Sequence, residues 1–218
     1  MNLNYRMEKR AYGLHRLENF ADRFYLSLWF PSISESEMLP RLTAVVKHFP
    51  FAESTRGFTR MAAYALDWNE AIVLEQFFDV ESEPNAAIAL AAEILHDDYA
   101  YQFDSNWDLW VPEGDDSADR WAVEPVPVQL VLRGTAFDDE IYKLHGHIML
   151  DLGLTGPFVF EGASVTESAK EHVRANIEKL IAFTGAVQKH CGLTGRLLWS
   201  ETENTLAQQL VQRLQQVQ

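Results

Sequence analysis

Two histidines and an aspartate recur at alternate positions in Leu144–Leu152, whose sequence is LHGHIMLDL. If this segment is a β-strand, His145, His147 and Asp151 lie on one face, because successive side chains of a strand point to opposite faces. Imidazole nitrogens with one carboxylate oxygen suit zinc, iron or manganese and leave positions for water or substrate. The spacing therefore predicts a divalent metal site, and ordinary hydrogen-bonded histidines on a wetter face are the alternative.

Nucleophilic and nucleotide chemistry have little support in the sequence. The single cysteine, Cys191, precedes Gly192 at the expected end of a helix. Carbonyl groups at a helix C-terminus disfavour a thiolate, so this residue is not expected to be a nucleophile. The sequence also lacks a Gly-x-Ser-x-Gly elbow and a glycine-rich phosphate loop. We therefore expect a non-enzymatic protein without a cofactor, and a metal-dependent or small-ligand enzyme is the alternative.

Negative charge is concentrated in one part of the chain. Residues 67–124 hold sixteen carboxylates and a single base, Arg120, whereas the whole chain has a net charge of −14. Four of the six tryptophans lie in the same stretch. Aromatic side chains make good interface anchors, and acidic groups around them attract a basic partner. We predict a binding surface formed by Trp107, Asp108, Trp110, Asp115, Asp116 and Trp121.

The same tryptophans have a second interpretation. Large aromatic side chains are more often buried in a core than exposed, and the acids would then form a solvated face. Trp107 and Trp110 are three residues apart, so a strand would place them on opposite faces. The sequence leaves both interpretations open.

The elements that position these residues follow an α+β pattern. Ser34 and Glu37 form a capping box at the start of a helix, and Pro84 can open a second one. The resulting βαββαβ order predicts a ferredoxin-like antiparallel sheet for residues 24–110. In chain order, the expected elements are a strand at 24–30, a helix from 34, a hairpin of strands at 61–66 and 71–78, a helix from 84 and a strand from 99.

Residues 111–122 are rich in Pro, Gly, Asp and Ser, which is typical of a loop, here an acidic one connecting two halves. The second half, 123–218, is predicted as a mixed βββαβα segment that extends the first sheet or packs against it as one compact unit. Residues 1–23 are expected to be an N-terminal extension. The expected elements are strands at 127–133, 142–152, 157–161 and 196–199, a helix from Ser164, and a helix after Ser200 whose stripe of Leu206, Leu210 and Leu214 is a candidate homo-oligomer contact.

Composition limits the class of protein. With 47% hydrophobic residues the chain can form a packed core, and it contains no apolar stretch long enough to span a bilayer and no signal-peptide core. A lone cysteine fits a reducing compartment, so we expect a cytoplasmic protein. Its negative charge repels nucleic acid and anionic membranes, which leaves a basic protein as the expected partner. We therefore predict a binding protein of the inhibitor or immunity type.

Overall fold

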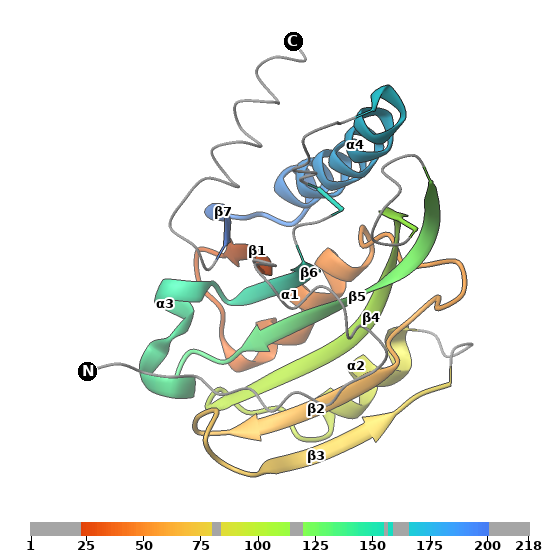
Figure 1. The fold of residues 1–218 in the computed structure, drawn as a ribbon. Coiled ribbons are helices and arrows are strands. Elements are labelled where there is room, and N and C mark those ends of the chain that lie inside the picture. Colours follow the sequence, from red (N-terminus) through yellow and green to blue (C-terminus); the bar gives the residue numbers. More distant parts are fainter. Residues whose placement is uncertain (1–22, 80–83, 114–119, 155–156, 159–165, 201–218) are drawn as a thin grey trace.

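The computed structural model describes residues 23–79, 84–113, 120–154, 157–158 and 166–200 (Figure 1). They form a mixed α+β fold around a seven-stranded antiparallel sheet in the order β3-β2-β4-β5-β6-β1-β7. The strands are β1 (Arg23–Trp29), β2 (Arg60–Ala65), β3 (Ile72–Phe77), β4 (Tyr99–Pro112), β5 (Trp121–Arg133), β6 (Ile148–Leu154) and β7 (Gly195–Ser200). The helices are α1 (Glu35–Val46), α2 (Pro84–Ala92), α3 (Tyr142–His145) and α4 (Glu167–His190), with a short 3₁₀ helix η1 (Phe137–Glu140).

Helix α1 begins as its sequence predicts. The Glu37 carboxylate accepts a hydrogen bond from the Ser34 backbone N–H at 3.0 Å, and this pair forms the expected capping box. The buried side chains of α1 include Met38, Leu42 and Val45, which follow helical spacing and face the sheet. The cap and the apolar stripe together fix both the start of the helix and the face it buries.

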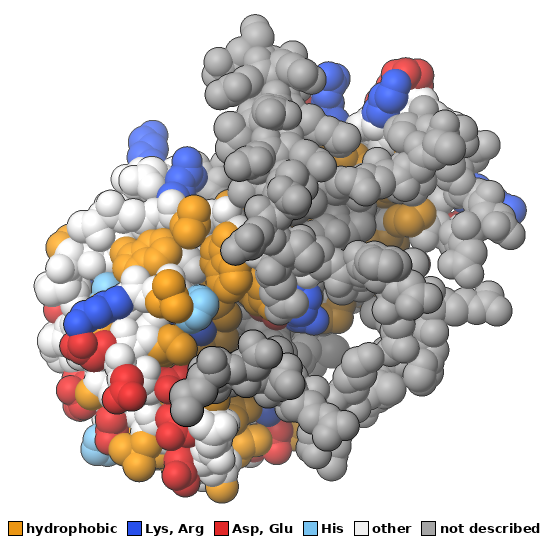
Figure 2. Space-filling view, turned by 60° about the vertical axis from the view of Figure 1, so that its left-hand side comes forward, with side chains coloured by type: hydrophobic (Ala, Val, Ile, Leu, Met, Phe, Trp, Pro, Cys, Tyr) orange, Lys and Arg blue, Asp and Glu red, His pale blue; other side chains and the backbone are white. Residues whose placement is uncertain are grey.

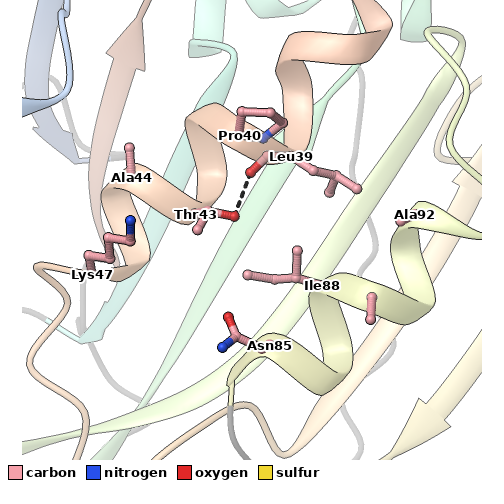
Figure 3. Close-up of a pocket in the computed structure, with 9 residues that line it drawn as sticks. Leu39, Pro40, Thr43, Ala44, Lys47, Asn85, Ile88 and Ala92 are labelled. Carbon is pink, nitrogen blue, oxygen red and sulfur yellow. Dashed lines mark hydrogen bonds between the residues drawn. The ribbon is translucent and has the colours of Figure 1, made fainter.

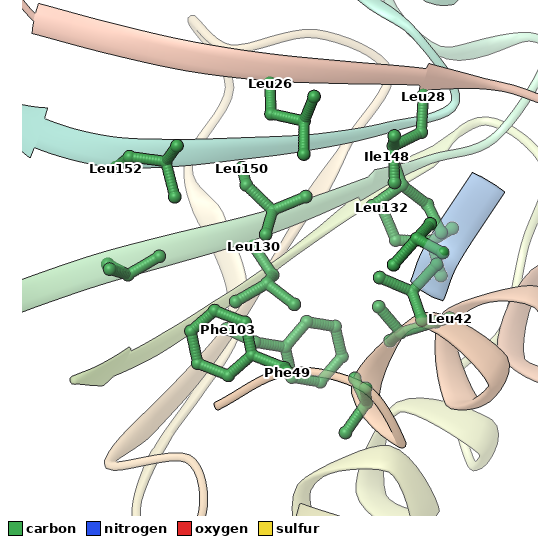
Figure 4. Close-up of a cluster of buried hydrophobic side chains, with 14 of the residues drawn as sticks. Leu26, Leu28, Leu42, Phe49, Phe103, Leu130, Leu132, Ile148, Leu150 and Leu152 are labelled. Carbon is green, nitrogen blue, oxygen red and sulfur yellow. The ribbon is translucent and has the colours of Figure 1, made fainter. Parts of the chain in front are cut away.

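The core lies between the sheet and the helices α1, α2 and α4, which cover the same face (Figure 1). Leucine and isoleucine side chains at alternate positions of β1, β5 and β6 point into it, because alternate residues of a strand share a face. Figure 4 shows Leu26, Leu130 and Leu150 on neighbouring strands, with Leu42 of α1 on the helical side. One continuous cluster of buried side chains therefore joins strands and helices from both halves of the chain.

The long hairpin of β4 and β5 holds the two halves of the sheet together. Its pairing is continuous from Ala100↔Arg133 to Pro112↔Trp121. Both strands extend into the segment expected to be a connecting loop over 111–122, and residues 114–119 of that loop lie outside the described part. The predicted boundary therefore falls at the tip of a hairpin within one sheet.

The ferredoxin-like arrangement expected for residues 24–110 is not confirmed, because the strand order differs. The element types occur in the predicted βαββαβ order, yet β1 pairs with β6 and β7 from the second half of the chain. Three strands, β4, β5 and β6, separate β1 from β2 in the sheet. The connection that contains α1 therefore carries the chain across the helical face, and local sequence patterns do not encode such a crossing.

The strand expected over 142–152 begins only at Ile148, since α3 occupies Tyr142–His145. Gly146 separates the two elements with a φ of 84°, a conformation that favours glycine. A Cβ at this position would also lie 2.8 Å from the backbone nitrogen of Leu28. Close approach to β1 thus requires a glycine here and ends the strand before it reaches His145.

Several other expectations concern the C-terminal region. Helix α4 begins at Glu167 with Thr166 as its N-cap, and the expected cap Ser164 lies outside the described residues. Pro157 and Phe158 form part of a turn, and the rest of the strand expected at 157–161 is also outside them. Residues 1–22 and the expected last helix with Leu206, Leu210 and Leu214 also lie outside the described residues.

In the described ranges, no helix is long and apolar enough to cross a membrane.

Candidate interaction surface

Trp107, the first tryptophan of the predicted binding surface, belongs to the core. Its side chain is 1% exposed, and its ring centroid lies 5.9 Å from that of Phe49 and 6.0 Å from that of Phe183. Its indole Nε1 is buried and has no hydrogen-bond partner among the described residues. This ring stabilises the packing of α4 on β4 and is not accessible to a partner.

Trp110 and Trp121 lie further along the hairpin than Trp107, and both contact α4. The His172 ring centroid lies 4.2 Å from that of Trp110 and 5.6 Å from that of Trp121. Asn176, one turn further along α4, is fully buried and hydrogen-bonds both backbone groups of Trp110. The two tryptophans therefore hold the helix against the hairpin and are only partly exposed.

The acidic members of the predicted surface are also dispersed or undescribed. Asp108 accepts a hydrogen bond from the Glu53 backbone N–H at 2.9 Å, and its own carbonyl accepts one from Lys179 Nζ at 2.8 Å. Asp115 and Asp116 lie outside the described residues. Of the four predicted residues that the structure describes, Trp107 is buried, and Trp110 and Trp121 are partly covered by α4.

The predicted metal ligands His145, His147 and Asp151 each have protein partners. Nδ1 of His147 accepts a hydrogen bond from the Phe30 backbone N–H at 3.2 Å. The ring of His145 is stacked on Trp199 with centroids 5.3 Å apart. Among the described residues, no group of three His, Cys, Asp or Glu side chains could hold a metal ion.

Asp151 is buried and paired with a base. Its Oδ2 accepts a hydrogen bond from Arg23 Nε at 3.0 Å, and its Oδ1 accepts one from the Gly153 backbone N–H at 2.9 Å. Burial lowers the pKa of Arg23, but the charge of Asp151 and the hydrogen bonds outweigh that effect and raise it. This ion pair links β1 to β6 and gives the carboxylate a structural role.

Burial favours the neutral form of both histidines of the predicted metal site. Burial lowers the pKa of His147, and burial together with the positive charge of Arg133 lowers the pKa of His145. Burial also raises the pKa of the Cys191 thiol, which disfavours its reactive thiolate. The Cys191 thiol is therefore not activated as a nucleophile.

A groove between α1 and α2 encloses about 550 Å³. Figure 3 shows Leu39 and Ile88 on facing helices, with Lys47 and Asn85 at one end. Lys47 is its only charged lining residue. No set of titratable groups converges in this groove, so its lining does not define a reaction site.

Acidic residues from three loops lie at one end of the sheet, which we call the acidic end. The loops are the β2–β3 turn, the segment before β4 and η1, and backbone hydrogen bonds join them. Figure 2 shows acidic side chains gathered on the lower part of the side of the molecule that carries α3 and the β2–β3 turn. The residues of the acidic end are Asp67, Glu70, Asp97, Asp98, Asp138, Asp139 and Glu140.

Leu66 lies at the centre of the acidic end in a strained conformation. Its φ is 65°, in the left-handed region, and its side chain is 58% exposed. Its N–H donates to the carbonyl of Asp98 at 2.9 Å, and its carbonyl accepts from the N–H of Asp138 at 2.7 Å. A left-handed conformation is unfavourable for leucine, and these two bonds hold it in place. The loops thereby display an apolar side chain among carboxylates.

The surroundings of Asp138 disfavour the charged form of its carboxylate. Burial raises the pKa of Asp138, and the charges of Asp67 and Asp139 raise it further, while Arg133 opposes them. Its Oδ2 is buried without a hydrogen-bond partner in the described part of the chain. A cation brought to this carboxylate would relieve that cost.

The sequence contains the acidic residues of this end but does not indicate that they lie close together. Asp67 and Glu70 lie between the strands expected at 61–66 and 71–78, and Asp138, Asp139 and Glu140 lie between those expected at 127–133 and 142–152, so the sequence gives no reason to place the two groups together. Their proximity follows from the strand order, in which β2, β4 and β5 are neighbours. Nothing in the residue pattern around Leu66 indicated its left-handed backbone.

No protein-family model, curated protein sequence or solved structure matches the chain. A functional assignment therefore depends on its own residues and their geometry.

Proposed function

We propose that the protein is a non-enzymatic binding protein whose acidic end contacts a basic protein partner. The observation that supports this most directly is Leu66, an exposed apolar side chain held in a strained conformation within a group of carboxylates. Strain of this kind is often found where a side chain serves a function. The protein thus has the binding role predicted from its sequence, but the contact is made by the acidic end and not by the predicted surface around Trp107, Trp110 and Trp121.

The physical organisation of the acidic end suits binding more than catalysis. Interfaces commonly combine an apolar anchor with a polar rim, and the rim charges steer the partner and select its sign. Leu66 would supply the anchor, and Asp67, Asp98 and Asp139 the rim. A lysine or arginine beside Asp138 would lower the cost of its charged form, so the carboxylate would favour a basic partner.

The chain as a whole would assist the approach of that partner. Its net charge of −14 attracts a cationic protein at long range, and salt screens this attraction. We also keep the cytoplasm as the proposed location, because the single cysteine is suited to a reducing compartment.

The experiment is a binding titration with poly-L-lysine as the probe, at low and at physiological ionic strength. Asp67→Asn/Asp139→Asn removes two charges from the acidic end, and Glu171→Gln/Glu178→Gln removes two from the exposed face of α4. We expect the first variant to weaken binding by about fivefold and the second by less than about twofold, since rim charges contribute modestly. Equal effects of the two variants, or binding indifferent to salt, would refute the proposal.

A further inference from the structure

The outer strand β3 exposes apolar side chains to an unusual degree. It pairs with β2 on one side and has no strand on the other among the described residues. Of the eight large apolar side chains that are exposed in the described ranges, half lie between residues 66 and 77. They are Leu66, Ile72, Val73 and Phe77. An open strand edge with exposed apolar side chains is a template for pairing with another chain.

The pairing of β3 with β2 defines which side chains share a face. Glu75 is opposite Ala62 and Phe77 is opposite Arg60, so both side chains lie on the face of the sheet away from α1, α2 and α4. The register shifts once, beside Val73, and the pairing is regular from Leu74 to Phe77. Phe77, 66% exposed, is the most prominent apolar side chain of this regular edge.

The charge of the β3 edge selects the kind of strand that could join it. Residues 67–79 contain four carboxylates and no lysine or arginine. Arg60 bonds Glu75 at 2.6 Å and Asp104 at 3.0 Å, so this group of three keeps a net negative charge. A second copy pairing through β3 would bring like charges together, whereas a basic strand would meet opposite charges.

We propose that β3 accepts a β-strand from the basic partner, which extends the sheet by one strand. Backbone hydrogen bonds would give affinity. Lysines or arginines at alternate positions of the incoming strand would lie near Glu75 and Asp79, where their aliphatic stems also cover Ile72 and Phe77, and its apolar side chains would lie beside Leu74 on the other face. The inference depends on the proposed function for the charge of the partner and adds the mode of binding. The acidic end and β3 adjoin at the β2–β3 turn, so one partner can contact both.

The opposite edge of the sheet provides an internal comparison. Strand β7 is also an outer strand, and its Leu197 is 51% exposed. It carries Arg196, whereas β3 carries no base. A basic strand should therefore choose β3 over β7.

The test uses the whole chain and short peptides of alternating lysine and valine, or of alternating glutamate and valine, as probes. We expect the lysine peptide to bind and to slow hydrogen exchange of β3 backbone amides, because paired N–H groups exchange slowly. The glutamate peptide should bind at least about tenfold more weakly. Equal binding of both peptides with protection of β3 would uphold strand addition but overturn the basic partner and, with it, the proposed function.

Two matched variants complete the test, since a lysine on an edge strand opposes pairing. Phe77→Lys should weaken binding of the lysine peptide by about tenfold, and Leu197→Lys on β7 should leave it within about twofold. Equal loss in both variants, or binding without protection of β3 amides, would overturn strand addition while leaving the acidic-end proposal standing. Sedimentation that shows a dimer lost in Phe77→Lys would instead identify a second copy as the occupant and overturn the inference.

Discussion

The side chain of Asn176 completes the backbone hydrogen bonds of Trp110. Its Nδ2 donates to the Trp110 carbonyl at 2.8 Å, and its Oδ1 accepts from the Trp110 N–H at 2.9 Å. The same Nδ2 also donates to the carbonyl of Pro157 at 2.8 Å. One buried amide thus joins α4 to the outer part of the β4–β5 hairpin, and this explains why the tryptophans there are structural.

Asn176→Leu should therefore destabilise the protein strongly. It keeps the size of the side chain but leaves three backbone groups without their partner, at a cost of about 2–4 kcal/mol in the free energy of unfolding. Chemical denaturation measures this cost, with Glu178→Ala on the exposed face of α4 as the control, expected within about 0.5 kcal/mol of the wild type. A similar small effect of Asn176→Leu would contradict the role assigned to this residue.

A second prediction concerns the pH dependence of stability. The pKa of His147 is lowered by burial, so the unfolded state binds a proton at a pH where the folded state does not. Stability contributed by neutral His147 is thus complete above about pH 6.5 and decreases as the pH falls below it. His147→Asn keeps an acceptor near the Phe30 N–H but cannot titrate, and it should flatten this acid-side slope. Denaturation at several pH values would show an unchanged slope if the assignment is wrong.

The sequence predicted local structure well where short-range chemistry decides it. The capping box of Ser34 and Glu37 starts α1, Pro84 opens α2, and the strand expected from residue 99 is β4. Each signal acts between residues that are neighbours in the chain. The hairpin of β2 and β3 was predictable for the same reason.

The pairing of the strands, and the face on which each side chain lies, were not predictable, since they depend on contacts between residues that are distant in the chain. His145 does not belong to the predicted strand, because Gly146 must lie close to β1. Strand β1 pairs with β6 and β7, which come from the second half of the chain. From the sequence alone, the tryptophans could belong to the core or to the surface, and only the position of α4 against them decides between the two. For the candidate site, the sequence supplied the carboxylates, and only the strand order brought Asp67, Asp98 and Asp138 together.

Two glycines should respond oppositely to alanine. A Cβ on Gly134 would lie 2.0 Å from the carbonyl oxygen of Asp97, whereas one on Gly185, within α4, meets nothing within 4 Å. Gly134→Ala should force the loops of the acidic end apart and destabilise by at least about 2 kcal/mol. Gly185→Ala should stabilise by about 0.5–1 kcal/mol, because alanine loses less conformational entropy in a helix. Thermal unfolding of both variants tests this contrast, and two shifts of the same sign would contradict it.

Asp138→Asn should stabilise the protein at neutral pH. Burial and the charges of Asp67 and Asp139 raise the pKa of Asp138, so its contribution to stability is lost as the pH rises through that folded pKa. Asparagine tolerates the left-handed φ of 49° and carries no charge. We expect a gain of about 0.5 kcal/mol at pH 7, kept small by solvent screening, and none near pH 3. A gain that is equal at both pH values would show that charge is not its cause.

Leu66→Asn should separate stability from binding. Asparagine adopts the left-handed conformation at lower cost than leucine, so the substitution should raise the free energy of unfolding by about 0.5–1 kcal/mol. It also removes the apolar anchor of the acidic end, and we expect weaker binding of a basic probe that carries apolar side chains, such as the lysine–valine peptide. Leu144→Asn is the control, because Leu144 is 70% exposed in α3 and has no strain to relieve. A more stable Leu66→Asn variant that binds as tightly as the wild type would show that the strain at this position does not serve recognition.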